Sequence, residues 1–183
     1  EQGYSVVLDR QAMIDEDSDQ IIGLFSPSGM PSENRIPSLA EMTNKAVESL
    51  SSNENGFFLM VEGSQIDWGG HANETPYVVR EVKDFDDAIG VVLAFAQENP
   101  GTLVIITADH ETGGMTINGV NRENTVVDIA WTSTGHTGTP IPLMAYGPHA
   151  VEFSGWWDNT DIGKKVADLL GFENFPLIIS ADK

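Results

Sequence analysis

An adjacent acid and imidazole, Asp109 and His110, follow an apolar, mostly β-branched run and directly precede a turn rich in glycine. A run of this kind is typical of a buried parallel strand. In open α/β sheets, ligands bind just beyond the carboxyl ends of the strands. Carboxylate and imidazole groups are both good zinc ligands. The pattern therefore predicts a ligand or metal site where this strand ends.

Two further segments carry side chains of the same kinds. Glu62 directly follows an apolar run at residues 57–61, and Asp67 and His71 come next, four residues apart. That spacing places Asp67 and His71 on one face if the segment forms a helical turn. His136 stands in a Gly/Thr loop, where glycine lets the backbone approach a small ion closely. Each feature alone also fits an ordinary surface residue or a loop cap, but their joint occurrence favours a site.

Together the three segments offer three carboxylates and three imidazoles. An all-oxygen site suits calcium or magnesium, whereas a mixture of oxygen and imidazole ligands suits zinc. Carboxylates held close together repel one another, and bound divalent cations remove that repulsion. Paired metal ions about 4 Å apart are a recurring device in phosphoryl transfer. The residue types therefore favour a centre with more than one cation.

Hydrophobic periodicity and turn residues indicate the elements that would position these side chains. Apolar runs predict strands over 4–8, 21–25, 57–61, 102–109 and 141–146, with an irregular β region over 115–131. Spacings of three and four residues predict helices over 39–50, from about 76 to 98, and over 161–170, with a capping box opening the first. Residues 27–37 are predicted to be a loop. Strands alternating with helices indicate an α/β fold with a mainly parallel sheet flanked by helices.

Composition narrows the function classes. The 183 residues fit one domain, and the net charge of −19 would repel a phosphate backbone, so we expect no nucleic-acid partner. No apolar stretch approaches the roughly 20 residues of a membrane span, and the absence of cysteine excludes thiolate zinc sites. Because the chain opens at Glu1 without Met or a signal sequence, we expect it to begin within a longer protein.

The segments around these residues resemble the C-terminal half of the alkaline phosphatases, bacterial members in particular. The similar blocks occur in family order and span essentially the whole chain: 56–63, 66–71, 107–110, 136–138 and 145–149. The resemblance implies that residues 1–183 form the C-terminal, metal-binding half of one three-layer α/β/α phosphatase domain, incomplete without its N-terminal half. It also implies an irregular β and loop insertion at about residues 115–135.

The resemblance assigns a first zinc to three of the predicted ligands. Asp67, His71 and His136 match the ligands of the zinc that, in the family, activates the attacking water and holds a phosphate oxygen. Trp68 occupies a position that varies in the family and tunes phosphate binding. We therefore expect Trp68 beside the ligands rather than among them.

The remaining predicted ligands match the other metal positions of the family. Asp109 and His110 match ligands of a second zinc, which in relatives binds and activates a serine nucleophile. Glu62 matches a ligand of a magnesium site. The family's nucleophile segment, its phosphate-clamping arginine and an aspartate that bridges two metals have no counterpart here. No catalytic residue is therefore expected within this chain.

The implied activity is hydrolysis of phosphate monoesters through a phosphoserine intermediate, at two zinc ions and one magnesium ion, with release of inorganic phosphate. By resemblance, the complete protein is expected to be a periplasmic or secreted homodimer in which this chain joins its N-terminal half. Activity of the chain alone is not expected. The alternatives are a non-catalytic zinc-binding module, a related phosphomutase, phosphodiesterase or sulfatase, and an acidic calcium-binding adhesion domain.

Overall fold

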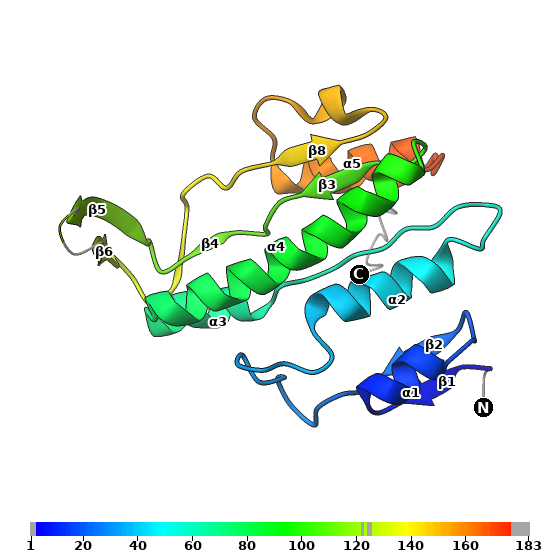
Figure 1. Ribbon diagram of the computed structural model, residues 1–183. Coiled ribbons are helices and arrows are strands. Elements are labelled where there is room, and N and C mark those ends of the chain that lie inside the picture. The colour runs from blue at the N-terminus through cyan, green and yellow to red at the C-terminus, as the bar shows by residue number, and fades with distance from the viewer. Residues whose placement is uncertain (1–2, 122, 124–125, 177–183) are drawn as a thin grey trace, which may run out of the picture.

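A computed structural model describes residues 3–121, 123 and 126–176, and it shows a mixed α/β arrangement in which short strands accompany five α-helices (Figure 1). The elements in chain order are β1 (Ser5–Val7), α1 (Arg10–Asp15), β2 (Ile21–Gly23), α2 (Leu39–Leu50), α3 (Gln65–Ala72), α4 (Thr75–Glu98), β3 (Val104–Ile106), β4 (Glu111–Thr112), β5 (Thr116–Asn121), β6 (Val126–Ala130), β7 (His136–Thr137), β8 (Met144–Tyr146), the 3-10 helix η1 (Ala150–Phe153) and α5 (Asn159–Leu169).

The predicted helices are confirmed, with small differences at their ends. α2 begins at the predicted capping box, in which the Ser38 side chain accepts from the Glu41 backbone and the Glu41 side chain accepts from the Ser38 backbone. The short helix α1 was not predicted, because its six residues are too few to show a hydrophobic period. Its start does carry a signal, since the Asp9 side chain caps the helix by accepting from the Ala12 backbone.

The prediction of a mainly parallel sheet is wrong for the residues that the structure describes. They form four separate two-stranded pairs, of which β1–β2 is parallel and β3–β8, β4–β7 and β5–β6 are antiparallel. A parallel return requires a crossover, usually through a helix, and the described chain between β3 and β8 contains no helix. The chain therefore comes back alongside β3 in the opposite direction.

Residues 57–61 also differ from their prediction, because they are not paired in a strand ladder. They run as an extended connection (Figure 1), and Phe57 contacts Phe95 of α4 with ring centroids 6.0 Å apart. A strand requires a hydrogen-bonding neighbour, and the described residues place none beside this segment. The extended backbone was therefore predicted correctly, and its pairing was not.

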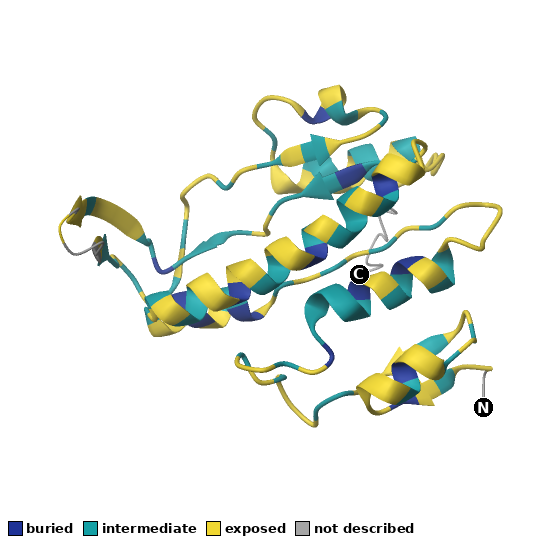
Figure 2. Ribbon diagram, in the orientation of Figure 1, coloured by how far each residue is buried: buried dark blue, intermediate teal, exposed yellow. Residues whose placement is uncertain are grey.

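The longest helix, α4, is the scaffold on which the other elements are packed. It contacts α2, α3 and β3, and its buried side chains include Ala88 and Ala96. Thr43 and Val47 are the buried residues of α2. Figure 2 shows that buried positions on both helices are interspersed with exposed ones. Small and β-branched side chains allow such helices to pack closely. The helix α3, which carries two predicted metal ligands, is thus attached to the main body of the protein through α4.

More buried and more exposed side chains alternate along two extended segments, at residues 6–8 and 57–61. Val7 is 3% exposed, whereas its neighbours Val6 and Leu8 are 58% and 64% exposed. Phe58 and Met60 are likewise 65% and 74% exposed, with partly buried residues on either side. Successive side chains of an extended chain point to opposite faces. One face of these segments is therefore packed, and the other presents large apolar side chains to solvent.

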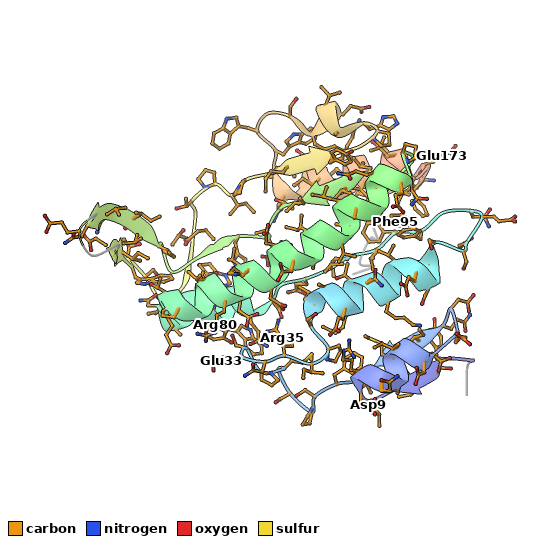
Figure 3. All side chains as sticks on the ribbon, viewed as in Figure 1. Asp9, Glu33, Arg35, Arg80, Phe95 and Glu173 are labelled. Atoms are coloured by element: carbon orange, nitrogen blue, oxygen red, sulfur yellow. The ribbon has the colours of Figure 1, made fainter. Side chains whose placement is uncertain are left out.

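Loop 27–37, as predicted, has no regular structure, and a buried ion cluster fixes it to α4. Arg35 lies 2.7 Å from Glu81 and 2.5 Å from Asp84, and the side chains of Arg35 and Glu81 are only 10% and 2% exposed. Figure 3 shows Arg35 near Arg80 of α4 and Glu33 of the same loop, which form a second, longer ion pair of 3.6 Å. The loop is therefore tied to the helix at several points.

Loss of the Arg35 charge is expected to destabilise the fold strongly. Arg35→Met should lower the free energy of unfolding by about 3 kcal/mol, because it leaves the carboxylate of Glu81 buried without a counterion. Arg10→Met is the matched control, since Arg10 forms an exposed pair with Glu41 and its loss should destabilise the fold far less. Urea unfolding measures both values. Equal destabilisation by the two variants would contradict the predicted difference.

Candidate metal centre

Three of the predicted ligands meet where α3 lies against β4 and β7. Asp67 and His71 stand one turn apart on α3, and His136 lies opposite Thr112 in the β4–β7 pair. The approach of α3 to β4 requires glycine at position 70, because a Cβ atom there would lie 2.8 Å from the Thr112 carbonyl oxygen. The glycines in the Asp67–His71 segment thus serve the packing that brings the side chains together.

The donor atoms of these three residues lie at distances that suit a single metal ion. The two Nε2 atoms of His71 and His136 are 3.2 Å apart, and they lie 3.4 Å and 3.5 Å from the two carboxylate oxygens of Asp67. Ligand atoms bound at 2.0–2.1 Å to a tetrahedral zinc are separated by roughly 3.3 Å. The three residues therefore form a candidate site for one metal ion, and their side chains are partly exposed.

Two hydrogen bonds orient these donors. The Nδ1 atom of His71 lies 2.6 Å from the carbonyl oxygen of Thr134, which can only accept, so Nδ1 is the donor in this contact and Nε2 is the ring atom that faces His136 and Asp67. The hydroxyl of Thr112 donates to Asp67 over 2.5 Å. This is the arrangement that commonly surrounds metal ligands in proteins.

Glu111 fastens the loop that carries His136. Its carboxylate accepts from the backbone N–H of Gly114 and from the hydroxyl of Thr137. Neither Glu111 nor its neighbour Thr112 was identified from the sequence. The available signal was their position, because short polar and acidic side chains directly after a ligand pair are well placed to orient it.

The second predicted pair lies beside the first cluster. His110 stacks on His136 with ring centroids 3.5 Å apart and an interplanar angle of 22°, and its Nε2 atom is 3.1 Å from the carboxylate of Asp109. The Thr112 hydroxyl, which donates to Asp67, is also 3.3 Å from His110 Nδ1. Asp109 is 82% exposed. The pair thus offers two donors next to the three-residue cluster.

The structure does not bring Glu62 into this cluster. Glu62 is exposed, and among the described residues only Asp67, His71 and His136 form a group of three potential ligands close enough for one ion. Trp68 follows Asp67 on α3 and is 47% exposed, and its expected place beside the ligands stays a prediction. The magnesium assignment of Glu62 stays a prediction.

A family model described as alkaline phosphatase matches residues 1–127 and 119–172, which together cover most of the chain. The chain belongs to the alkaline phosphatase family. This agrees with the resemblance of its sequence blocks and with the metal-binding character of the cluster.

Individual relatives agree with the family match. Alkaline phosphatase 3 of Bacillus subtilis is 33% identical, and the aligned region covers 93% of this chain and 53% of that protein. The crystal structure of a cold-active alkaline phosphatase from Shewanella sp. matches with a TM-score of 0.84 at 28% identity, covering 92% of this chain and 60% of that one. The alkaline phosphatase of the Antarctic bacterium TAB5 matches with a TM-score of 0.81 at 37% identity, covering 92% and 52%.

Two facts from these comparisons bear on function. The chain spans about half the length of the curated relatives it matches. A mutant of the TAB5 enzyme is described with magnesium bound in its M3 site, so a relative of this chain binds a divalent cation.

None of the helices in the described ranges combines the length and the apolar character that crossing a bilayer would require.

Removal of the Thr112 hydroxyl is expected to weaken metal binding. Thr112→Val should reduce zinc affinity about tenfold, because Asp67 loses the hydrogen bond that orients its carboxylate. Thr116→Val is the matched control, since the Thr116 hydroxyl bonds the Ala130 carbonyl within the β5–β6 pair. Isothermal titration with zinc measures both affinities. An unchanged affinity in Thr112→Val would contradict an orienting role for this residue.

Proposed function

We propose that this chain supplies the metal-binding half of an enzyme that hydrolyses phosphate monoesters through a phosphoserine intermediate. The observation that carries the proposal is the set of donor atoms on Asp67, His71 and His136, which have zinc-like separations in a chain of the alkaline phosphatase family. We assign two zinc ions and one magnesium ion to the complete centre. The family match and the magnesium-containing relative support divalent cations as the cofactors.

Asp67, His71 and His136 would hold the first zinc. Zinc bound by three protein ligands keeps a fourth position open and can lower the pKa of a bound water to about 7. His71 would contribute its Nε2 atom, and the single charge of Asp67 would leave the zinc-loaded centre with a net positive charge. A net positive centre suits a phosphate oxygen as the further ligand.

Asp109 and His110 would hold the second zinc, and Glu62 would contribute to the magnesium site. The stacking of His110 on His136 supports a second metal position beside the first. Two donors are fewer than the four that a tetrahedral zinc usually has. We therefore propose that the remaining ligands, the serine nucleophile and a phosphate-binding arginine come from the other half of the protein.

The charge of the chain supports a role for cations in substrate binding. A net charge of −19 repels an anionic phosphate ester. Cations bound at the Asp67 cluster would reverse the local potential where the ester has to bind. Phosphate monoesters and inorganic phosphate are therefore the small-molecule partners that we propose.

The exposed apolar side chains support a further partner, the other half of the same protein. Val6, Leu8, Phe58 and Met60 present large apolar side chains to solvent from two extended segments, and exposed apolar surface of this kind favours contact with further protein. The relatives are about twice as long as the region they share with this chain.

By family resemblance we also propose a homodimer that functions in the periplasm or outside the cell.

A non-catalytic zinc-binding role for the chain by itself is the second candidate. The observation that favours it is that the donors of only one of the proposed metal positions come together within the described residues. The family match meanwhile favours alkaline phosphatases over phosphomutases, phosphodiesterases and sulfatases. The two candidates differ in whether the chain alone turns over a phosphate ester.

Zinc titration combined with a phosphatase assay tests the proposal. The chain should bind zinc but should not hydrolyse p-nitrophenyl phosphate until the other half of the protein is added. His136→Ala should lower the zinc content and the restored activity, because the first zinc loses one of its three ligands. His149→Ala is the matched control, since His149 pairs with Glu152 outside the cluster. Normal zinc content in His136→Ala would contradict the ligand assignment, and no activity after reconstitution would favour the non-catalytic role.

The apolar face predicts self-association of the isolated chain. Phe58→Lys combined with Met60→Lys should shift the chain towards monomer, because these substitutions place charge on the exposed face. Val151→Lys, at a residue that is 80% exposed on η1, is the matched control and should leave association unchanged. Analytical ultracentrifugation measures the distribution. If the unmodified chain is monomeric at high concentration, the predicted self-association through these exposed apolar side chains is wrong.

A further inference from the structure

Loop 27–37 contacts α3 at the turn that carries Asp67. The side-chain amide of Gln65 donates to the Met30 carbonyl of the loop over 2.6 Å, and its amide oxygen accepts from the Tyr77 hydroxyl over 2.7 Å. Gln65 is only 7% exposed. A buried amide with both ends paired holds its neighbours in a defined arrangement. The loop is therefore fixed to the first turn of α3 two residues before Asp67.

A second contact joins the loop to Trp68. A Cβ atom at Gly29 would lie 2.5 Å and 2.6 Å from two ring atoms of the Trp68 indole. Those distances are far shorter than any real Cβ contact. The loop backbone can therefore pack directly on the indole only with glycine at position 29. Trp68 directly follows Asp67 on α3, so the loop packs on a side chain whose backbone adjoins that of the predicted ligand.

The loop has the rigidity that such a role needs. Its far end is anchored by the buried ion cluster of Arg35 with Glu81 and Asp84 on α4. Burial raises the pKa of the Tyr77 hydroxyl, so this group stays protonated and continues to donate to Gln65. Both anchors belong to α4, which also packs against α3. The loop, α4 and α3 therefore form one connected unit around Trp68.

We infer that loop 27–37 is a positioning element of the metal centre, and that it acts through the Trp68 indole and Gln65 to orient Asp67. The inference rests on the proposed function, since it concerns the affinity of the Asp67 cluster for zinc. Gly29, Met30 and Gln65 touch neither the donor atoms nor a substrate, so they are positioning residues. The sequence pattern of this loop pointed only to irregular structure.

A double-mutant cycle tests the inference. Gly29→Ala should weaken zinc binding about tenfold, because the added methyl group displaces the indole next to Asp67. In a Trp68→Ala background the same change should have almost no further effect, because the ring that it displaces is absent. Gly90→Ala is the matched control, since a Cβ at Gly90 meets no atom within 4 Å. Full additivity of Gly29→Ala and Trp68→Ala would overturn the inference.

A measurement independent of zinc separates this inference from the proposed function. In the chain labelled with 5-fluorotryptophan, the fluorine resonance of Trp68, assigned by Trp68→Phe, should shift in Gly29→Ala and stay in place in Gly90→Ala. An unshifted resonance would overturn the inference even if the chain binds zinc. Absence of zinc binding by the unmodified chain would instead overturn the proposed function, and the resonance would still show whether the loop positions the indole.

Discussion

The close approach of α3 to β4 is the constraint on which the candidate centre depends. Gly70 permits that approach, because any side chain there would meet the Thr112 backbone. Once α3 is in place, its one-turn spacing aligns Asp67 with His71, and the β4–β7 pairing supplies His136 from the opposite side. The donors come from two segments far apart in the chain, α3 and β7, so no local interaction could bring all three together. Tertiary packing creates the site, and the donors contribute little to that packing because they are partly exposed.

The sequence predicted the helices and the donor types better than it predicted the sheets. Capping and periodicity are local, so α2 and α4 could be located from their own residues. Strand pairing is not local, and the parallel sheet was wrong because the pattern of a buried strand does not reveal its neighbour. The donors of the first cluster could be named because Asp67, His71 and His136 are of types that bind zinc. Thr112 could not be found, because its role comes from where β4 meets α3.

Two kinds of electrostatic arrangement coexist in the protein and serve different purposes. The carboxylate of Glu81 is buried and neutralised by Arg35, an arrangement that fixes the loop but offers nothing to a ligand. The carboxylates of Asp67 and Asp109 are more exposed and face imidazoles, which can give up a proton and bind a cation. Burial combined with a fixed counterion therefore distinguishes the structural acids from the candidate ligands. Net charge alone could not make that distinction.

The exposed apolar face and the incomplete donor sets have a common explanation in the proposed function. Alternating side chains such as Phe58 and Met60 have the pattern of strands covered on both faces, yet only one face is covered here. The Asp109–His110 pair likewise has the chemistry of a metal site but only two donors. Relatives about twice as long as the shared region contain enough additional chain to cover the face and to complete the ligands. In the proposed function, an additional layer against residues 57–61 would also lie near the magnesium position, because the predicted ligand Glu62 follows this segment directly.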